Sequence, residues 1–155
     1  MDQRNIFVLG LNAFNRRKLE RIRHAGRYRF HGILDPAAIL EGEHFPIDEM
    51  LAQAEREIAA SGARPDAIIG YVDFPVSTML PLLAERFGVR AASLESLLKC
   101  EHKYWSRCVQ QEVVPEHIPA FQAFDPFAGD AADQVTLDYP FWVKPVKSAG
   151  SFLGF

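Results

Sequence analysis

The stretch IFVLG, residues 6–10, is a continuous apolar run that ends at a glycine. Such a run is typical of a β-strand buried on both faces, as in a parallel sheet covered by helices. Strand-like and helix-like segments then alternate along the chain, which is the order expected of an α/β protein. We therefore predict a three-layer, Rossmann-like α/β domain with a mainly parallel sheet.

Further strands are expected at residues 28–34, 67–72 and 89–92, where apolar and β-branched residues gather. Helices are expected from an Asn15 cap to Gly26, from Pro46 to Gly62, and from the region of residues 77–78 to Gly88. Each of these helices ends at a glycine that can adopt the left-handed conformation of a C-terminal cap. From Ser93 onward a further helical segment is expected to carry residues 99–109.

The composition narrows the class of protein. The chain has 155 residues, of which 48% are hydrophobic and 24% charged, and its net charge is −3. This composition is typical of a soluble globular protein, and the bulk charge indicates neither nucleic acid nor an anionic membrane as a partner. With two cysteines a disulfide framework is not expected, and the apolar run at residues 6–11 is too short to span a membrane. We expect a cytoplasmic protein.

A basic segment near the N-terminus permits a second interpretation, a nucleic-acid contact. We favour a solvated face, because the chain as a whole is acidic. The segment contains Arg16, Arg17, Lys18, Arg21, Arg23, Arg27 and Arg29.

The composition of the sequence changes beyond Val113, where several prolines occur. Residues 121–124 in this region are expected to form a strand. We predict a first domain at residues 1–98. Residues 99–155 are then a linker helix and the start of a second domain.

The stretch YPFWVKPVKSAGS, residues 139–151, places a lysine in an apolar strand that leads into a loop of small residues. Pro145 biases Lys144 toward extended backbone, and the pleat of a strand then places Trp142, Lys144 and Val146 on one face. An ammonium group beside apolar side chains needs an anion or several acceptors.

The loop that follows this strand could supply such an anion site. Ser148, Gly150 and Ser151 allow main-chain amides to approach a phosphate. The alternative interpretation is a lysine whose head reaches solvent beside an ordinary hairpin turn.

A second basic feature repeats every four residues, at Lys99, Lys103 and Arg107. On one exposed helix such like charges repel by roughly 0.2–0.5 kcal/mol per pair, and a bound anion would relieve the repulsion. The alternative is a solvated stripe that Glu95 and Glu101 partly neutralise.

Together these residues resemble the ATP-grasp enzymes, in the branch typified by biotin carboxylase and carbamoyl-phosphate synthetase. The resemblance rests on the helix segment Glu101–Tyr104, followed 41 residues after Lys103 by a P-x-x-V-K-P strand that contains Lys144. It implies a pre-ATP-grasp domain followed by the beginning of an α+β ATP-grasp subdomain. It also implies that Lys103 and Lys144 hold the phosphates of ATP, with the loop of Ser148, Gly150 and Ser151 folded over them.

The resemblance further implies the chemistry of an ATP-dependent ligase. A carboxylate substrate attacks ATP to give an acyl phosphate, and an amine or other nucleophile then displaces the phosphate. The magnesium ligands of such enzymes are expected downstream of the glycine-containing loop, so this chain alone should be inactive and should bind Mg²⁺-ATP weakly. An unpaired apolar strand at residues 151–155 would favour association into a homodimer.

Two other classes of function compete with this interpretation. A dinucleotide-dependent oxidoreductase would need further glycines after Gly10, and residues 11–15 lack them. The other alternative is a non-catalytic interaction or nucleotide-binding module that kept the fold and lost the chemistry.

Overall fold

The computed structural model describes residues 3–42, 44–148 and 153–155. The chain divides into two compact units, Met1–Leu94 and Glu95–Phe155. The assignment of residues 1–98 and 99–155 to functionally distinct domains stays a prediction.

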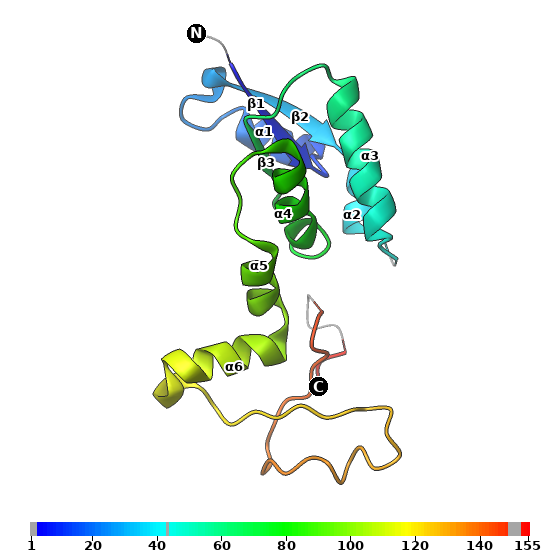
Figure 1. Ribbon diagram of the computed structural model, residues 1–155, viewed down its shortest axis with the longest axis vertical. Helices are drawn as coiled ribbons and strands as arrows, with labels where there is room; N and C mark the ends of the chain where they lie inside the picture. Colours follow the sequence, from blue (N-terminus) through cyan, green and yellow to red (C-terminus); the bar gives the residue numbers. More distant parts are fainter. Residues whose placement is uncertain (1–2, 43, 149–152) are drawn as a thin grey trace. The chain divides into compact units, whose positions relative to one another are not determined.

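The first unit contains a three-stranded parallel sheet in the order β2-β1-β3 (Figure 1). Its strands are β1 (Arg4–Leu9), β2 (Tyr28–Ile33) and β3 (Ala67–Ile69). The apolar run that opens the sequence occupies the central strand, where Phe7, Val8 and Leu9 are at most 1% exposed. The predicted α/β fold with a parallel sheet is therefore confirmed.

The described part of the first unit contains four α-helices besides the sheet. Two of these helices supply most of the helical residues that are buried in the core. Helices α3 (Ile47–Ala60) and α4 (Val76–Phe87) contact β2 and β3 respectively and pack against each other. The buried cluster combines strand residues with the apolar faces of these helices, and Gly88 ends α4 in the left-handed conformation, as predicted. The helices α1 (Ala13–Leu19) and α2 (Pro36–Leu40) and the 3₁₀ turn η1 (Ala25–Arg27) are shorter.

Side-chain caps explain two differences from the sequence-based expectation. The helix expected from Asn15 to Gly26 begins earlier and is shorter, because Asn12 Oδ1 accepts a hydrogen bond from Asn15 N at 2.9 Å and so caps α1. Helix α2 was not predicted. Asp35 caps it through the Ala37 amide at 2.9 Å, and Pro36 occupies its first position.

The strand expected at residues 89–92 is absent, and this part of the prediction is wrong. The Val89 amide donates to Ala84 O at 2.9 Å, so the chain after Gly88 completes the C-terminal cap of α4 instead of joining the sheet.

The second unit contains α5 (Leu94–Glu101), α6 (Lys103–Val113) and the 3₁₀ turn η2 (Pro115–His117). No strand occurs among its described residues, so the strands expected at 121–124 and around Lys144 are not formed. At residues 121–124, the Gln122 side chain accepts a hydrogen bond from Thr136 N at 2.9 Å, in place of the backbone pairing expected of a strand. In neither unit do the described residues include a helix long and apolar enough to cross a bilayer.

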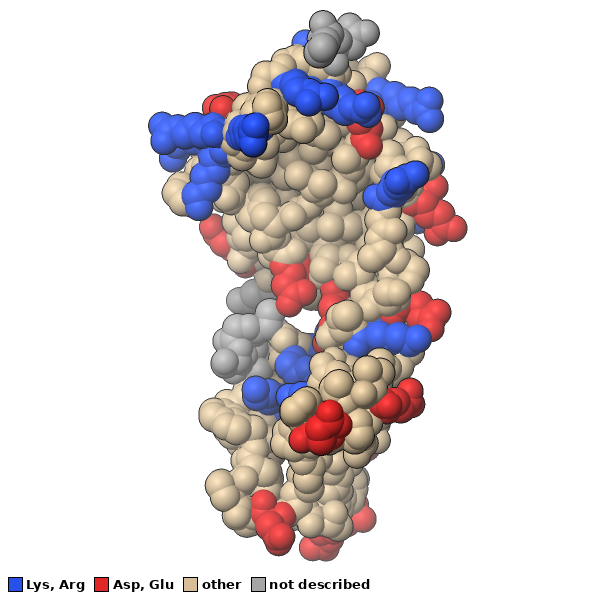
Figure 2. All heavy atoms as spheres, turned by 90° about the vertical axis from the view of Figure 1, so that its left-hand side faces the viewer, with Lys and Arg blue, Asp and Glu red and all other residues tan. Residues whose placement is uncertain are grey.

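Charge is unevenly distributed along the first unit. Residues 1–34 contain eight Lys and Arg residues but two acidic residues, whereas residues 35–94 contain four basic and ten acidic residues. Figure 2 shows Lys and Arg side chains gathered over the end of this unit where the chain begins. The amino ends of the strands therefore lie in a positive region.

Gly70 follows β3 at a close approach to α4, and we expect Gly70→Ala to destabilise the first unit by about 1–3 kcal/mol. An added Cβ would clash with Cγ1 of Val76, a fully buried and β-branched side chain that has little freedom to move. Urea unfolding measures the loss.

Gly26→Ala is the matched control, because nothing lies within 4 Å of its added Cβ. Adding Val76→Ala removes the clashing methyl group, so the Gly70→Ala/Val76→Ala chain should be more stable than the sum of the single losses predicts. Equal stability of the Gly70 and Gly26 variants would refute the clash.

His31 is expected to make the stability of the first unit depend on pH. Burial lowers its pKa below the ordinary value of 6.5, and the nearby charges of Arg29 and then Arg16 lower it further. Between the folded and the unfolded pKa the unfolded chain binds more protons, so this contribution is complete above pH 6.5 and is lost as the pH falls through the folded pKa.

Urea midpoints recorded between about pH 7.5 and pH 5 test this expectation. The wild-type midpoint should fall on acidification more steeply than that of His31→Gln, which carries no titrating group. Parallel curves for the two proteins would contradict it.

Candidate phosphate-binding site

The break between α5 and α6 lies at His102, whose extended backbone has φ −78° and ψ 102°. Its Nδ1 atom accepts a hydrogen bond from Trp105 N at 3.2 Å and so caps α6. The prediction that one helix carries Lys99, Lys103 and Arg107 is therefore wrong, because the His102 side chain caps a new helix that begins at Lys103.

Lys103 is the first residue of α6, and it contacts the segment 146–148 with both its backbone and its side chain. Its amide donates to Val146 O at 2.8 Å. Its ammonium group donates to Ser148 O at 2.6 Å and lies 3.2 Å from Ser148 Oγ. The structure thus brings together Lys103 and Ser148, two of the predicted site residues, although 45 positions separate them.

The other two cations of the predicted stripe have partners on their own helices. Lys99 Nζ lies 2.7 Å from Glu95 Oε1, and the hydrogen bond and charge of Lys99 lower the pKa of Glu95 below its ordinary value. Arg107 Nη1 donates to Gln110 Oε1 at 2.9 Å. Of the three, Lys103 is the one for which the structure records a contact with segment 146–148.

An ion pair also joins the same two segments, and the sequence did not predict it. Lys147 Nζ lies 3.3 Å from Glu101 Oε2, and the Glu101 side chain is 9% exposed. Glu101 ends α5 and Lys103 begins α6, so both sides of the break contact residues 146–148.

Lys144 is exposed, and its Nζ atom lies 5.6 Å from the centre of the Trp142 ring. Exposure alternates from residue 141 to 146, with Trp142, Lys144 and Val146 exposed and the residues between them half-buried. This alternation matches the predicted pleat. Among the described residues, Val143 exchanges two backbone hydrogen bonds with Phe155, at 2.7 and 3.1 Å.

Two other predicted residues, Gly150 and Ser151, lie outside the described residues. The convergence of Lys103 and Lys144 on one phosphate chain stays a prediction.

The start of α6 has the chemistry of an anion site. A helix N-terminus carries a partial positive charge, and the first turn of α6 contains no acidic side chain. The Lys103 ammonium adds a full charge and contacts both oxygen atoms of Ser148. These groups fit a phosphate. For magnesium the described residues offer no cluster of three or more His, Cys, Asp or Glu side chains.

The loop after β1 is closed by a tyrosine from the end of β3. The Tyr71 hydroxyl donates a short hydrogen bond to Gly10 O and accepts one from Asn12 N at 3.4 Å. In dinucleotide-binding folds this turn must leave room for a pyrophosphate close to the backbone. The tyrosine contacts here argue against the oxidoreductase alternative.

Comparisons with known proteins support the fold. No family model matches the chain, and no curated protein matches it. Among solved structures, an L-amino acid ligase from Bacillus licheniformis is similar, with a TM-score of 0.61 and 16% sequence identity over 96% of this chain. The chain spans 38% of the length of that ligase. At this identity the likeness shows a shared fold.

Proposed function

We propose that this chain is the N-terminal portion of an ATP-dependent ligase that activates a carboxylate as an acyl phosphate. The observation that carries the proposal is the contact of the Lys103 ammonium with Ser148, at 2.6 Å from the carbonyl oxygen. It fixes a cation at a helix N-terminus beside the segment that follows Lys144. The fold shared with an L-amino acid ligase supports the same class of reaction.

In the proposed reaction ATP supplies a phosphoryl group to the substrate carboxylate, and ADP leaves. An amine or other nucleophile then attacks the acyl carbon and phosphate departs. Lys103 and Lys144 act by charge, holding phosphate oxygens in position, and neither transfers a proton. Ser148, with Gly150 and Ser151 beyond it, closes over the phosphates. The magnesium ligands are expected on the part of the ligase that follows this chain, so the chain contributes one wall of the site.

Trapping the acyl phosphate tests the proposal. The complete protein encoded by the gene is incubated with Mg²⁺-ATP, hydroxylamine and a panel of amino acids and other small carboxylates. An acyl phosphate acylates hydroxylamine, so we expect a hydroxamate together with an equal amount of ADP for at least one carboxylate. ATP turnover without hydroxamate, or no turnover with any carboxylate, would contradict the proposed function. A non-catalytic interaction module would give the second result.

A further inference from the structure

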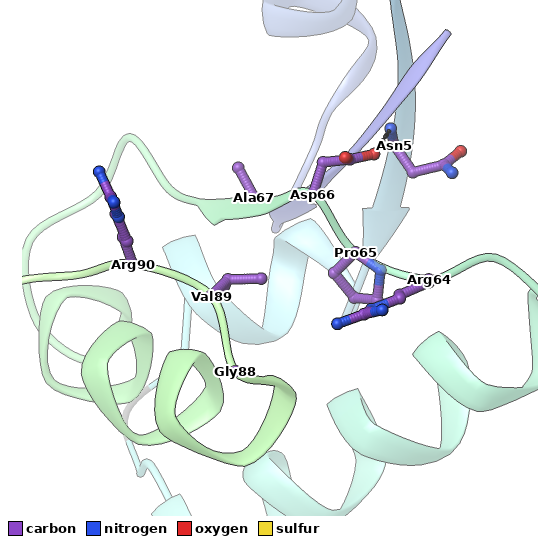
Figure 3. A pocket seen from close by; sticks show the side chains of 8 residues that line it. All are labelled: Asn5, Arg64, Pro65, Asp66, Ala67, Gly88, Val89 and Arg90. Carbon is purple, nitrogen blue, oxygen red and sulfur yellow. Dashed lines mark hydrogen bonds between the residues drawn. The ribbon is translucent and has the colours of Figure 1, made fainter. Parts of the chain in front are cut away.

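A pocket of about 570 Å³ lies at the amino end of the sheet in the first unit (Figure 3). Residues from the starts of β1 and β3 and from the segment after α4 line it. Its volume is within the range of small-molecule sites. No residue of the proposed phosphate site lines it.

Two arginines give the pocket its charge. Figure 3 shows Arg64 and Arg90 on opposite sides of it, with Pro65, Ala67 and Val89 between them. In the part of the chain that the structure describes, neither guanidinium group has an ion pair or a side-chain hydrogen bond. Both are exposed and able to bind a ligand.

Asp66 is the one acidic residue of the lining, and its charge is already neutralised. One carboxylate oxygen accepts from Asn5 N at 2.8 Å, and the other lies 3.4 Å from Arg4 Nη1. Figure 3 shows this carboxylate directed toward Asn5. The pocket and its neighbour Arg4 thus combine three guanidinium groups with one carboxylate, which leaves an excess of two positive charges.

We propose that this pocket binds a small organic anion through a carboxylate or phosphate group. Guanidinium groups form paired, charge-assisted hydrogen bonds with either group. Ala67 and Val89, which line the pocket and are half-buried, offer an apolar surface for the body of the ligand. The surrounding positive end of the unit attracts anions to the pocket. This site does not depend on the proposed ligase function.

The test uses three probes with the same phenyl body: phenyl phosphate, benzoate and the neutral benzyl alcohol. Each is titrated into the ¹⁵N-labelled full chain, and amide shifts are followed at residues 64, 66, 67 and 88–90. We expect the two anions to shift these amides and benzyl alcohol to bind at least about tenfold more weakly. Tighter binding of phenyl phosphate assigns a phosphoester ligand, and tighter binding of benzoate assigns a carboxylate. Equal binding of benzyl alcohol would overturn the proposal.

Variants separate charge from shape. Arg64→Gln/Arg90→Gln should lower the affinity for the preferred anion at least about tenfold, whereas Arg64→Lys/Arg90→Lys should retain part of it. Arg56→Gln is the matched control, because Arg56 is an exposed arginine of α3 that does not line the pocket. Arg90→Gln alone, a change at an exposed side chain, gives the same reading if the double variant is unstable. Unchanged affinity in the Arg90 and double variants would refute the site.

Discussion

Lys103→Gln is expected to lower the rate of hydroxamate formation by the complete protein about 10²–10³-fold, the usual cost of removing one preorganised group that stabilises charge in a transition state. Glutamine keeps a donor of similar length but removes the charge that the structure places at the N-terminus of α6. The same ammonium group also donates to Ser148 O at 2.6 Å, so the substitution should loosen segment 146–148. Both effects lower the turnover number more than they change the affinity for the carboxylate.

Lys99→Gln is the matched control for this prediction. Lys99 lies one turn earlier on α5 and forms its ion pair within that helix, with Glu95 at 2.7 Å. Solvent screens an exposed pair of this kind, and in the described part of the chain the pair does not contact segment 146–148, so the control should retain nearly full activity. Equal activity of the two variants would show that Lys103 does not act on the phosphates.

Phe7→Ala is expected to destabilise the first unit by about 3–5 kcal/mol, the typical cost of removing a buried aromatic ring. Phe7 is 0% exposed in the central strand, and its ring stacks on that of His31 with centroids 4.5 Å apart. A domain of this size has a total stability of about 5–15 kcal/mol, so the variant should be largely unfolded well below the wild-type urea midpoint.

Phe14→Ala provides the comparison for the core substitution. Phe14 lies in the same unit but is 56% exposed, and its recorded contact is with the Lys18 ammonium group, 4.3 Å from the ring centre. Its loss should cost less than about 1 kcal/mol. Similar midpoints for the Phe7 and Phe14 variants would show that β1 is not the centre of the core.

Periodicity in the sequence predicted the elements that bury most surface. The run at residues 6–10 is β1, and the apolar positions of α3 and α4 lie in the core as expected. Element ends were harder to predict because they depend on single side-chain hydrogen bonds, such as those of Asn12 and His102. A short apolar segment such as 89–92 is also ambiguous, because its backbone can form the hydrogen bonds of a helix cap instead of those of a sheet.

The sequence singled out Lys103 and Ser148, which are in contact in the structure, and their role in binding phosphate stays a prediction. It could not indicate that Lys147 pairs with Glu101, because an ion pair between residues 46 positions apart depends on how the two segments pack. No sequence motif indicated the pocket between Arg64 and Arg90, because its residues come from three separate stretches of the chain.

The strand order β2-β1-β3 also has a consequence for biosynthesis. The ribosome synthesises the central strand β1 before either of its neighbours. About sixty more residues must be added after β1 before β3 is complete at Ile69. At translation speeds of about 5–20 residues per second this takes roughly 3–12 s. During that interval the apolar side chains of Phe7, Val8 and Leu9 are exposed and prone to aggregate. We expect a nascent-chain chaperone to bind this stretch until translation has passed β3.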